Sequence, residues 1–194
     1  DLGAFEYNHG PIGPQSGTYL VGAGNSLPTG FPSISVAIRT LICNGINGNV
    51  VLRLNDVEYP AENYPIVIPA IPGTNTYTVT IRPSTGVDPL INGYCSIALF
   101  HKSGANNIIF DGWDGAGALN RDLKIENIFP NAGRVFLFDA GTANSTVRNT
   151  VIQGSNTNTN YVYSGLISFT GTPAGHHNLV ENNDISTSTG MQLH

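Results

Sequence analysis

Short apolar runs separated by turn-forming residues recur along the chain from residue 49 onward. Four of the clearest are NVVLRLNDVEY, YPIVIPA, TYTVTIRP and CSIALFHK, which are rich in the β-branched and aromatic residues that favour strands. Gly, Asn, Pro or Asp separates one run from the next. None of the connections carries a helical pattern, which argues against a doubly wound sheet whose parallel strands are joined by helices. The pattern therefore predicts an all-β fold over this part of the chain.

An earlier segment, residues 31–45, has helical spacing instead. The apolar positions that share one face of this segment are Ile34, Ala37, Ile38 and Leu41. Ser33 is suited to cap the first turn, and Gly45 is suited to end the last one. We predict a single amphipathic helix at residues 33–44, preceded by a short strand within residues 17–24.

The strand runs repeat in pairs. Three runs end in a phenylalanine, at Phe100, Phe138 and Phe169, and each is followed nine or ten residues later by the apolar centre of a second strand. The interval between the second and third phenylalanines is somewhat shorter than that between the first and second. Self-similarity of this kind indicates stacked repeats. We predict that the three rings stack inside the molecule on parallel strands, with Phe138 between the other two.

An asparagine recurs in strands of the second kind. Asn127 and Asn149 hold matching places in successive strands of this kind, and Asn182 holds the same place in the last pair. The spacing of the first two suggests a unit of about 22 residues, which suits one coil of a parallel β-helix, whose coils rise by ~4.8 Å and lengthen by insertions at the corners. Because Asn tolerates left-handed backbone at a corner, we predict an Asn ladder of these three residues. An antiparallel sandwich is the alternative, but it does not predict the recurring pair of strands.

A parallel β-helix also gives the single helix a purpose. The open end of a coil stack exposes core side chains and unpaired strand edges. An amphipathic helix just before the first coil is suited to cover that end. We therefore expect an N-terminal capping helix, with coils beginning near Val50.

Composition narrows the choice of partners. Charged residues make up only 11% of the 194 residues, the net charge is −5, and Lys102 and Lys124 are the only lysines. The chain thus lacks a basic patch for nucleic acid, and it lacks an apolar run of the ~20 residues that cross a bilayer. Cys43 and Cys95 have no metal-site spacing. We interpret them as separately buried thiols, with a disulfide as the alternative in an exported protein.

The opening of the domain carries a resemblance. Residues 17–19 are Gly-Thr-Tyr, residues 31–38 contain the helical Phe-x-Ser-Ile-x-x-Ala-Ile, and residues 47–51 read Asn-Gly-Asn-Val-Val. This succession resembles the start of right-handed parallel β-helix modules of the pectate-lyase-like superfamily. Such modules occur in large surface proteins that Gram-negative bacteria export by the type IX pathway. The resemblance covers about residues 16–190 and implies a secreted, cell-surface location.

The first eight residues, DLGAFEYN, are similar to the Asp-aliphatic-Gly-Ala-x-Glu-aromatic tag that closes modules of this family. The resemblance implies that residues 1–8 are the tail of a preceding module and residues 9–16 a linker. Residues 17–194 would then be a β-helix module that is incomplete at its C-terminal end. Flanking modules of the same polypeptide are the partners that follow from this division.

The segment FDGWDG is the best candidate for chemistry. Trp113 is suited to stack on a sugar ring, while Asp111 and Asp114 are suited to bind Ca²⁺ or to act as an acid and a base. The plainer interpretation is a polar turn, and Asp139 is interpreted in the same way. His101 and Lys102 end a strand and are expected to face solvent. We assign no catalytic residue, no set of metal ligands and no cofactor other than Ca²⁺ as a candidate.

These features favour a non-catalytic structural or adhesive β-helix module of a large secreted cell-surface protein. Surface or environmental glycans are its candidate partners; nucleic acid and membrane insertion are not expected. The alternative is a carbohydrate-binding or carbohydrate-degrading β-helix domain, because fold alone does not establish function.

Overall fold

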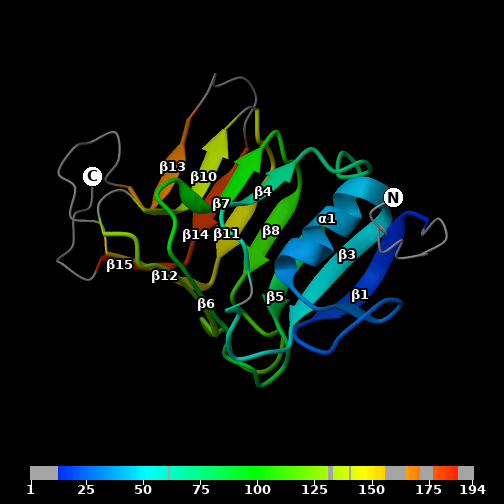
Figure 1. Ribbon diagram of the computed structural model, residues 1–194, viewed down its shortest axis with the longest axis horizontal. Helices are drawn as coiled ribbons and strands as arrows, with labels where there is room; N and C mark the ends of the chain where they lie inside the picture. Colours follow the sequence, from blue (N-terminus) through cyan, green and yellow to red (C-terminus); the bar gives the residue numbers. More distant parts are fainter. Residues whose placement is uncertain are drawn as a thin grey trace, which may run out of the picture.

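The chain forms a parallel β-solenoid of about five turns. The computed structural model describes residues 13–60, 62–130, 133–139, 141–155, 165–170 and 177–187. Three parallel sheets, here called A, B and C, form the walls, and from residue 79 onward the chain visits them in the order A, B, C in successive turns. Figure 1 shows strands far apart in the sequence lying side by side in each wall. The predicted parallel β-helix is confirmed, and all strand pairings within the sheets are parallel.

Sheet A has seven strands in the order β14-β11-β8-β5-β3-β1-β2. Their bounds are β1 Gln15–Val21, β2 Gly30–Phe31, β3 Ile46–Leu54, β5 Val79–Pro83, β8 Ile108–Asp111, β11 Thr146–Arg148 and β14 Leu179–Glu181. Sheet B has four strands, namely β6 Leu90–Gly93, β9 Leu123–Asn127, β12 Thr150–Gly154 and β15 Asp184–Thr187. Sheet C also has four: β4 Ile66–Pro69, β7 Ala98–Ser103, β10 Arg134–Asp139 and β13 Ile167–Phe169.

The coil is longer than the spacing of Asn127 and Asn149 predicted, and its length varies. Lys124 of β9 pairs with Val151 of β12, whereas Ile109 of β8 pairs with Thr146 of β11, which is a clearly longer interval along the chain. The predicted coil length was wrong because it matched Asn127, at the end of β9 in sheet B, with Asn149, at the corner between β11 and β12. The stack also begins earlier than Val50, since β1 pairs in parallel with β3 over most of its length.

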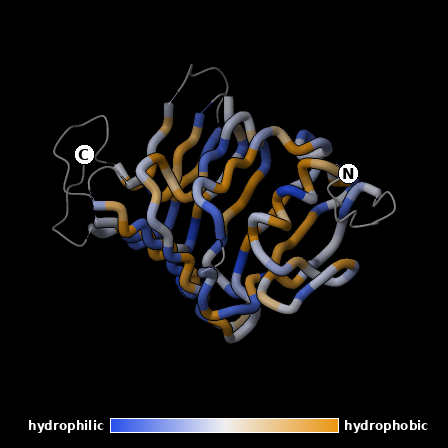
Figure 2. Tube along the Cα trace, in the orientation of Figure 1, coloured by the Kyte–Doolittle hydropathy of each residue, from blue (hydrophilic) through white to orange (hydrophobic). Residues whose placement is uncertain are grey.

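In most strands from β3 to β12, alternating side chains fill the core. In β3, Val50, Leu52 and Leu54 are fully buried, while Val51 and Arg53 between them are half-buried on the outer side. This alternation follows from the two-residue period of a strand. Figure 2 shows the same alternation as orange and blue bands along the strands. Apolar side chains from all three sheets meet in one cluster, so the turns share a continuous core.

The predicted helix is confirmed as α1, Ile34–Asn44. The hydroxyl of Ser33 accepts a hydrogen bond from the Val36 amide at 3.2 Å, and Gly45 ends the helix with φ = 70°. The four predicted apolar side chains are all buried, and they join the core cluster. In Figure 1, α1 lies over β1 and β3, next to β4 at the edge of sheet C. It therefore covers the core at this end of the solenoid, as predicted.

The phenylalanine stack is confirmed only in part. Phe138 is 2% exposed and stacks on Phe169, with ring centroids 4.6 Å apart. Phe100, however, pairs with Phe136 and stacks on it at 5.5 Å, while Phe138 pairs with Lys102. The predicted register was wrong by two positions. A shift of two keeps a side chain on the same face of a strand, which is why Phe138 still points inward.

The asparagine ladder is likewise confirmed for two members. Asn149 and Asn182 both have left-handed backbone, with φ of 54° and 50°, and the Asn182 amide donates to Asn149 Oδ1 at 2.7 Å. Asn127 was wrongly included. It ends β9 in sheet B. There its side-chain oxygen accepts a hydrogen bond from Cys95 N at 3.2 Å, and its side-chain nitrogen donates one to Cys95 O at 2.8 Å.

Lys102 and Cys43 also differ from expectation. Lys102 was expected to face solvent, yet it is fully buried, because it lies two positions beyond the inward-facing Phe100 on the same strand. Cys95 is buried as predicted, but Cys43 is exposed, and the two thiols are not bonded to each other. The proposed tail at residues 1–8, and residues 9–12 of the proposed linker, lie outside the described residues.

Candidate functional site

The structure brings the three predicted site residues into one loop that follows β8. Asp111, the last residue of β8, is 1% exposed. Its Oδ2 accepts two bonds from Arg148, from Nε at 3.1 Å and from the terminal Nη2 at 2.9 Å. Its Oδ1 accepts from the Asn149 amide at 2.7 Å and from the Trp113 backbone N–H at 3.2 Å. Asp111 thus continues the asparagine ladder by one step and ties β8 to the corner after β11.

Asp114 is bonded to the backbone in a similar way. Its Oδ1 accepts from the Ala116 N–H at 2.7 Å, and its Oδ2 accepts from the Gly86 N–H at 3.1 Å. These backbone hydrogen bonds hold the pKa of Asp114 below its usual range, because they stabilise the ionised form. The carbonyl of the same residue accepts from Arg53 Nη1 at 2.5 Å. Asp114 therefore fixes its own loop to two earlier coils.

Trp113 is half-buried and faces an arginine. The Arg82 guanidinium lies 5.3 Å from the ring centroid and donates two bonds to the Trp113 carbonyl, at 3.0 and 2.6 Å. The indole Nε1 donates to the Ala116 carbonyl at 3.1 Å. The four carboxylate oxygens of Asp111 and Asp114 and the indole N–H thus all bond within the protein. This geometry suits residues that link neighbouring coils by hydrogen bonds. The ligand-binding role of these residues stays a prediction.

Sequence reasoning missed a histidine–aspartate pair on the outer face of sheet C. His101 Nε2 lies 2.6 Å from Asp139 Oδ2, and both side chains are partly exposed. Asp139 was predicted to lie in a turn, but it is the last residue of β10. The register that pairs Leu137 with His101 and Asp139 with Ser103 places the two residues on neighbouring strands. Because the two residues lie a whole coil apart along the chain, no local sequence pattern indicates the pair.

Lys102 is the second residue whose position the sequence did not reveal. Its ammonium lies 4.5 Å from the ring centroid of Phe138 and 5.1 Å from that of Phe110, and its hydrogen bond to the Ile108 carbonyl is long, at 3.4 Å. Burial lowers the pKa of Lys102 to about 7, because the core disfavours the charged form. Within the described part of the chain, no carboxylate pairs with it.

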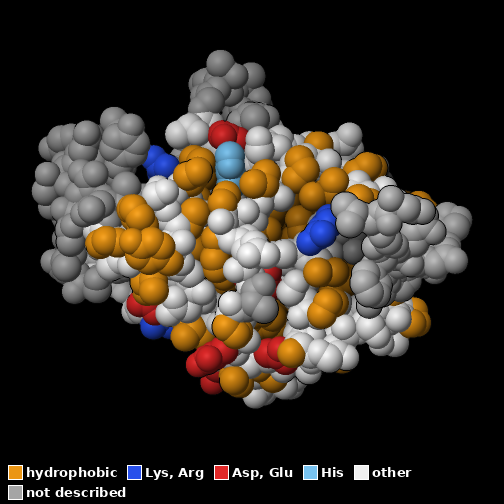
Figure 3. All heavy atoms as spheres, in the orientation of Figure 1, with side chains coloured by type: hydrophobic (Ala, Val, Ile, Leu, Met, Phe, Trp, Pro, Cys, Tyr) orange, Lys and Arg blue, Asp and Glu red, His pale blue; other side chains and the backbone are white. Residues whose placement is uncertain are grey.

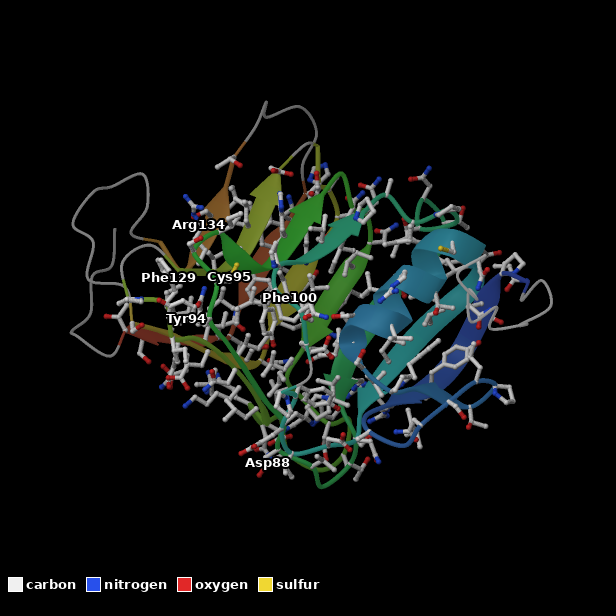
Figure 4. All side chains as sticks on the ribbon, viewed as in Figure 1. Asp88, Tyr94, Cys95, Phe100, Phe129 and Arg134 are labelled. Carbon is white, nitrogen blue, oxygen red and sulfur yellow. The ribbon has the colours of Figure 1, made fainter. Side chains whose placement is uncertain are left out.

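A cleft of about 560 Å³ opens at the β6 edge of sheet B. Residues 58–60 and 62–64 form one wall, β6 and Tyr94 form the other, and Ile128 closes one side. In Figure 3, an apolar patch lies at the left of the molecule, at the position where Figure 4 labels Tyr94 and Phe129. No motif in the sequence pointed to this cleft, because its walls come from three separate coils.

The geometry of the described residues supports neither a metal site nor a membrane-crossing helix. There, no group of three His, Cys, Asp or Glu side chains is arranged to hold a metal ion. The same residues contain no helix long and apolar enough to cross a membrane.

Comparisons with protein-family models, with curated proteins and with solved structures gave no match. What is established is that the described residues form a nearly all-β parallel solenoid with one short helix near its N-terminal end.

Proposed function

We propose that this solenoid is a non-catalytic structural or adhesive module of a large secreted cell-surface protein. The observation that carries the proposal is the continuous stack of parallel, in-register coils around one core. In such a stack each coil contacts only its neighbours, so that coils add length in one direction and give a stiff rod. A stiff rod is suited to holding other modules away from a surface.

The hydrogen bonding of the candidate carboxylates within the protein supports a structural rather than a catalytic role. A general acid or base needs an oxygen within reach of a substrate proton. In Asp111 and Asp114, each oxygen is already committed to an N–H of the protein. The sequence resemblance to exported β-helix modules supports the secreted location and the presence of flanking modules.

Two measurements test the proposal. Antibodies raised against the purified chain should label intact, unpermeabilised cells that produce the parent protein, and brief protease treatment of those cells should remove the label. Labelling that requires permeabilisation would overturn the surface location. Separately, the chain should release no products from a panel of neutral and acidic polysaccharides; turnover that Asp111→Asn abolishes would overturn the non-catalytic role.

A further inference from the structure

We propose that the cleft between β6 and the wall formed by residues 58–60 and 62–64 binds a short neutral oligosaccharide. This inference does not rest on the display role proposed above, since the isolated chain should bind. The volume of the cleft, about 560 Å³, lies within the roughly 300–1,000 Å³ typical of small-molecule sites. The cleft is distinct from the loop that carries Asp111 and Trp113, which supplies none of its lining residues.

One wall of the cleft presents an aromatic ring to solvent. Tyr94 is 64% exposed, the largest exposure of any tyrosine in the described part of the chain. Phe129 holds it edge to face, with ring centroids 5.0 Å apart and an interplanar angle of 67°. Figure 4 shows the two side chains next to each other on the outside of the solenoid. The face of an aromatic ring is electron-rich, so it suits the C–H groups on one face of a pyranose.

The apolar surface continues beside this ring. Ile128 is 45% exposed, and its backbone N–H donates to the Gly93 carbonyl at 2.9 Å, which fixes it beside Tyr94. Exposed apolar residues gathered at a cleft are a mark of binding sites in soluble domains. The pair provides a platform on which a sugar ring can rest.

The cleft also offers free hydrogen-bonding groups. Glu58, Asn63 and Asn92 are exposed, and within the part of the chain that the structure describes their side chains make no hydrogen bond. Sugar hydroxyls both donate and accept, as the amide and carboxylate groups here require.

The opposite wall is held in place before any ligand arrives. Glu62, which is 8% exposed, accepts backbone hydrogen bonds from Ile34 and Ser35 at the start of α1, the latter at 2.8 Å. A carboxylate at a helix N-terminus is favourably placed, so this contact anchors the wall to the helix at Glu62. The Tyr64 ring packs over Gly93, where a Cβ atom would collide with it. A wall fixed in this way loses little entropy on binding.

The charge of the cleft selects among saccharides. Its described lining residues include Glu58 and Glu62 but neither Lys nor Arg. An acidic polysaccharide would therefore be repelled. An uncharged sugar would not, and this difference commits the proposal to neutral ligands.

Isothermal titration calorimetry of the full 194-residue chain tests the proposal, with cellotriose, maltotriose and N,N′,N″-triacetylchitotriose as neutral probes and trigalacturonic acid as the acidic comparator. At least one neutral probe should bind, and the acidic one should not. Tyr94→Ala should weaken the affinity by about tenfold or more, since buried aromatic anchors dominate binding. Tyr94→Phe, which keeps the ring, should stay within about threefold of the parent.

Two further variants keep the test sharp. Asn92→Ala should weaken binding by roughly threefold to tenfold through the loss of one hydrogen bond, and it provides a second readout if Tyr94→Ala does not fold. Leu119→Ala, at an exposed position outside the cleft, should leave the affinity unchanged. The proposal is overturned if no neutral probe binds, if only the acidic probe binds, or if Leu119→Ala rather than Tyr94→Ala removes binding. None of these outcomes depends on where the parent protein is located, so they are separable from failure of the display role.

Discussion

Lys102 and Asp111 are both ionisable and both buried, at 0% and 1% exposure, yet the solenoid treats them differently. Asp111 accepts bonds from Arg148, Asn149 and the Trp113 amide. Lys102 has one long hydrogen bond, at 3.4 Å, and a surround of phenylalanine rings. The carboxylate is fully satisfied, whereas the amine is poorly satisfied.

The difference follows from the position in the coil. Asp111 lies at a corner, where the next coil turns and offers an amide and a guanidinium from residues 148 and 149. Lys102 lies in the middle of an inward-facing row in sheet C, where the neighbouring coils offer only apolar side chains. A corner can therefore hold a charge that stabilises the stack. A charged group inside the walls must either lose its charge by deprotonation or lower the stability of the fold.

The largest expected effect is on the ring that covers the buried amine. Phe138→Ala removes a ring 4.5 Å from Lys102 Nζ and stacked on Phe169, and should lower the free energy of unfolding by about 3–5 kcal/mol through lost burial and a cavity. Phe169→Ala is the matched control. That residue is 54% exposed, so its loss should be about 1 kcal/mol. Equal losses in urea unfolding would contradict the burial that the comparison assumes.

The second-largest loss of stability is expected at the hydrogen-bonded carboxylate of Asp111. Asp111→Ala removes the acceptor for Arg148, Asn149 and the Trp113 amide and should cost about 2–4 kcal/mol, less than a wholly buried pair because the Arg148 side chain is 41% exposed. The free energy of unfolding of Asp111→Asn should lie between those of Asp111→Ala and the parent. Asp88→Ala, an exposed aspartate labelled in Figure 4, should be neutral within about 0.5 kcal/mol. An Asp111→Ala protein as stable as the Asp88→Ala protein would show that the corner bonds contribute nothing.

The unpaired amine should reveal itself in the pH dependence of stability. Burial lowers the pKa of Lys102 to about 7 from its ordinary 10.5. Between these values the unfolded chain holds a proton that the folded chain has released, so stability rises with pH; below about pH 7 both states are charged and the full penalty applies. The gain from pH 7 to pH 9 should be about 2 kcal/mol.

Lys102→Met isolates this effect. The substitution keeps the length of the side chain in the core and removes the charge, so the variant should be more stable at pH 7 and its stability should lack that rise. The quantity to compare is the difference between the two proteins in chemical unfolding at each pH, which cancels other titrating groups. A parallel pH dependence in parent and variant would mean that the amine is paired in solution.

The smallest effect concerns the ladder beside Asp111. Asn149→Gly removes the amide between Asp111 and Asn182 but accepts the φ of 54°, so it should cost about 1 kcal/mol. Asn149→Ala should cost more, by roughly 1–2 kcal/mol, because a Cβ atom is strained in left-handed backbone. If thermal unfolding ranked the two variants in the opposite order, the corner conformation would not be the determinant.

The amino-acid sequence was sufficient for the class of fold and for local elements. The apolar spacing of residues 34–41, with Ser33 and Gly45 at its ends, predicted α1 within one residue, because capping and periodicity are local properties. The recurring pairs of short strands predicted a parallel solenoid, because coils that stack in register repeat their pattern along the chain. The repeated position of Phe138 at the end of an apolar run correctly predicted that its ring points inward.

Register and sites were decided by the tertiary structure alone. Insertions at the corners make the coils unequal in length, so neither the pairing of Phe100 with Phe136 nor the placement of Asn127 in sheet B can be counted from residue spacing. Strand alternation places Lys102 on the same face as Phe100, but the register between coils decides that its neighbours are Ile68 and Phe138. The fastening of Asp111 and the walls around Tyr94 likewise join residues from different coils. The physical reason is that local propensity acts over a few residues, whereas contacts between coils depend on the accumulated length of every corner.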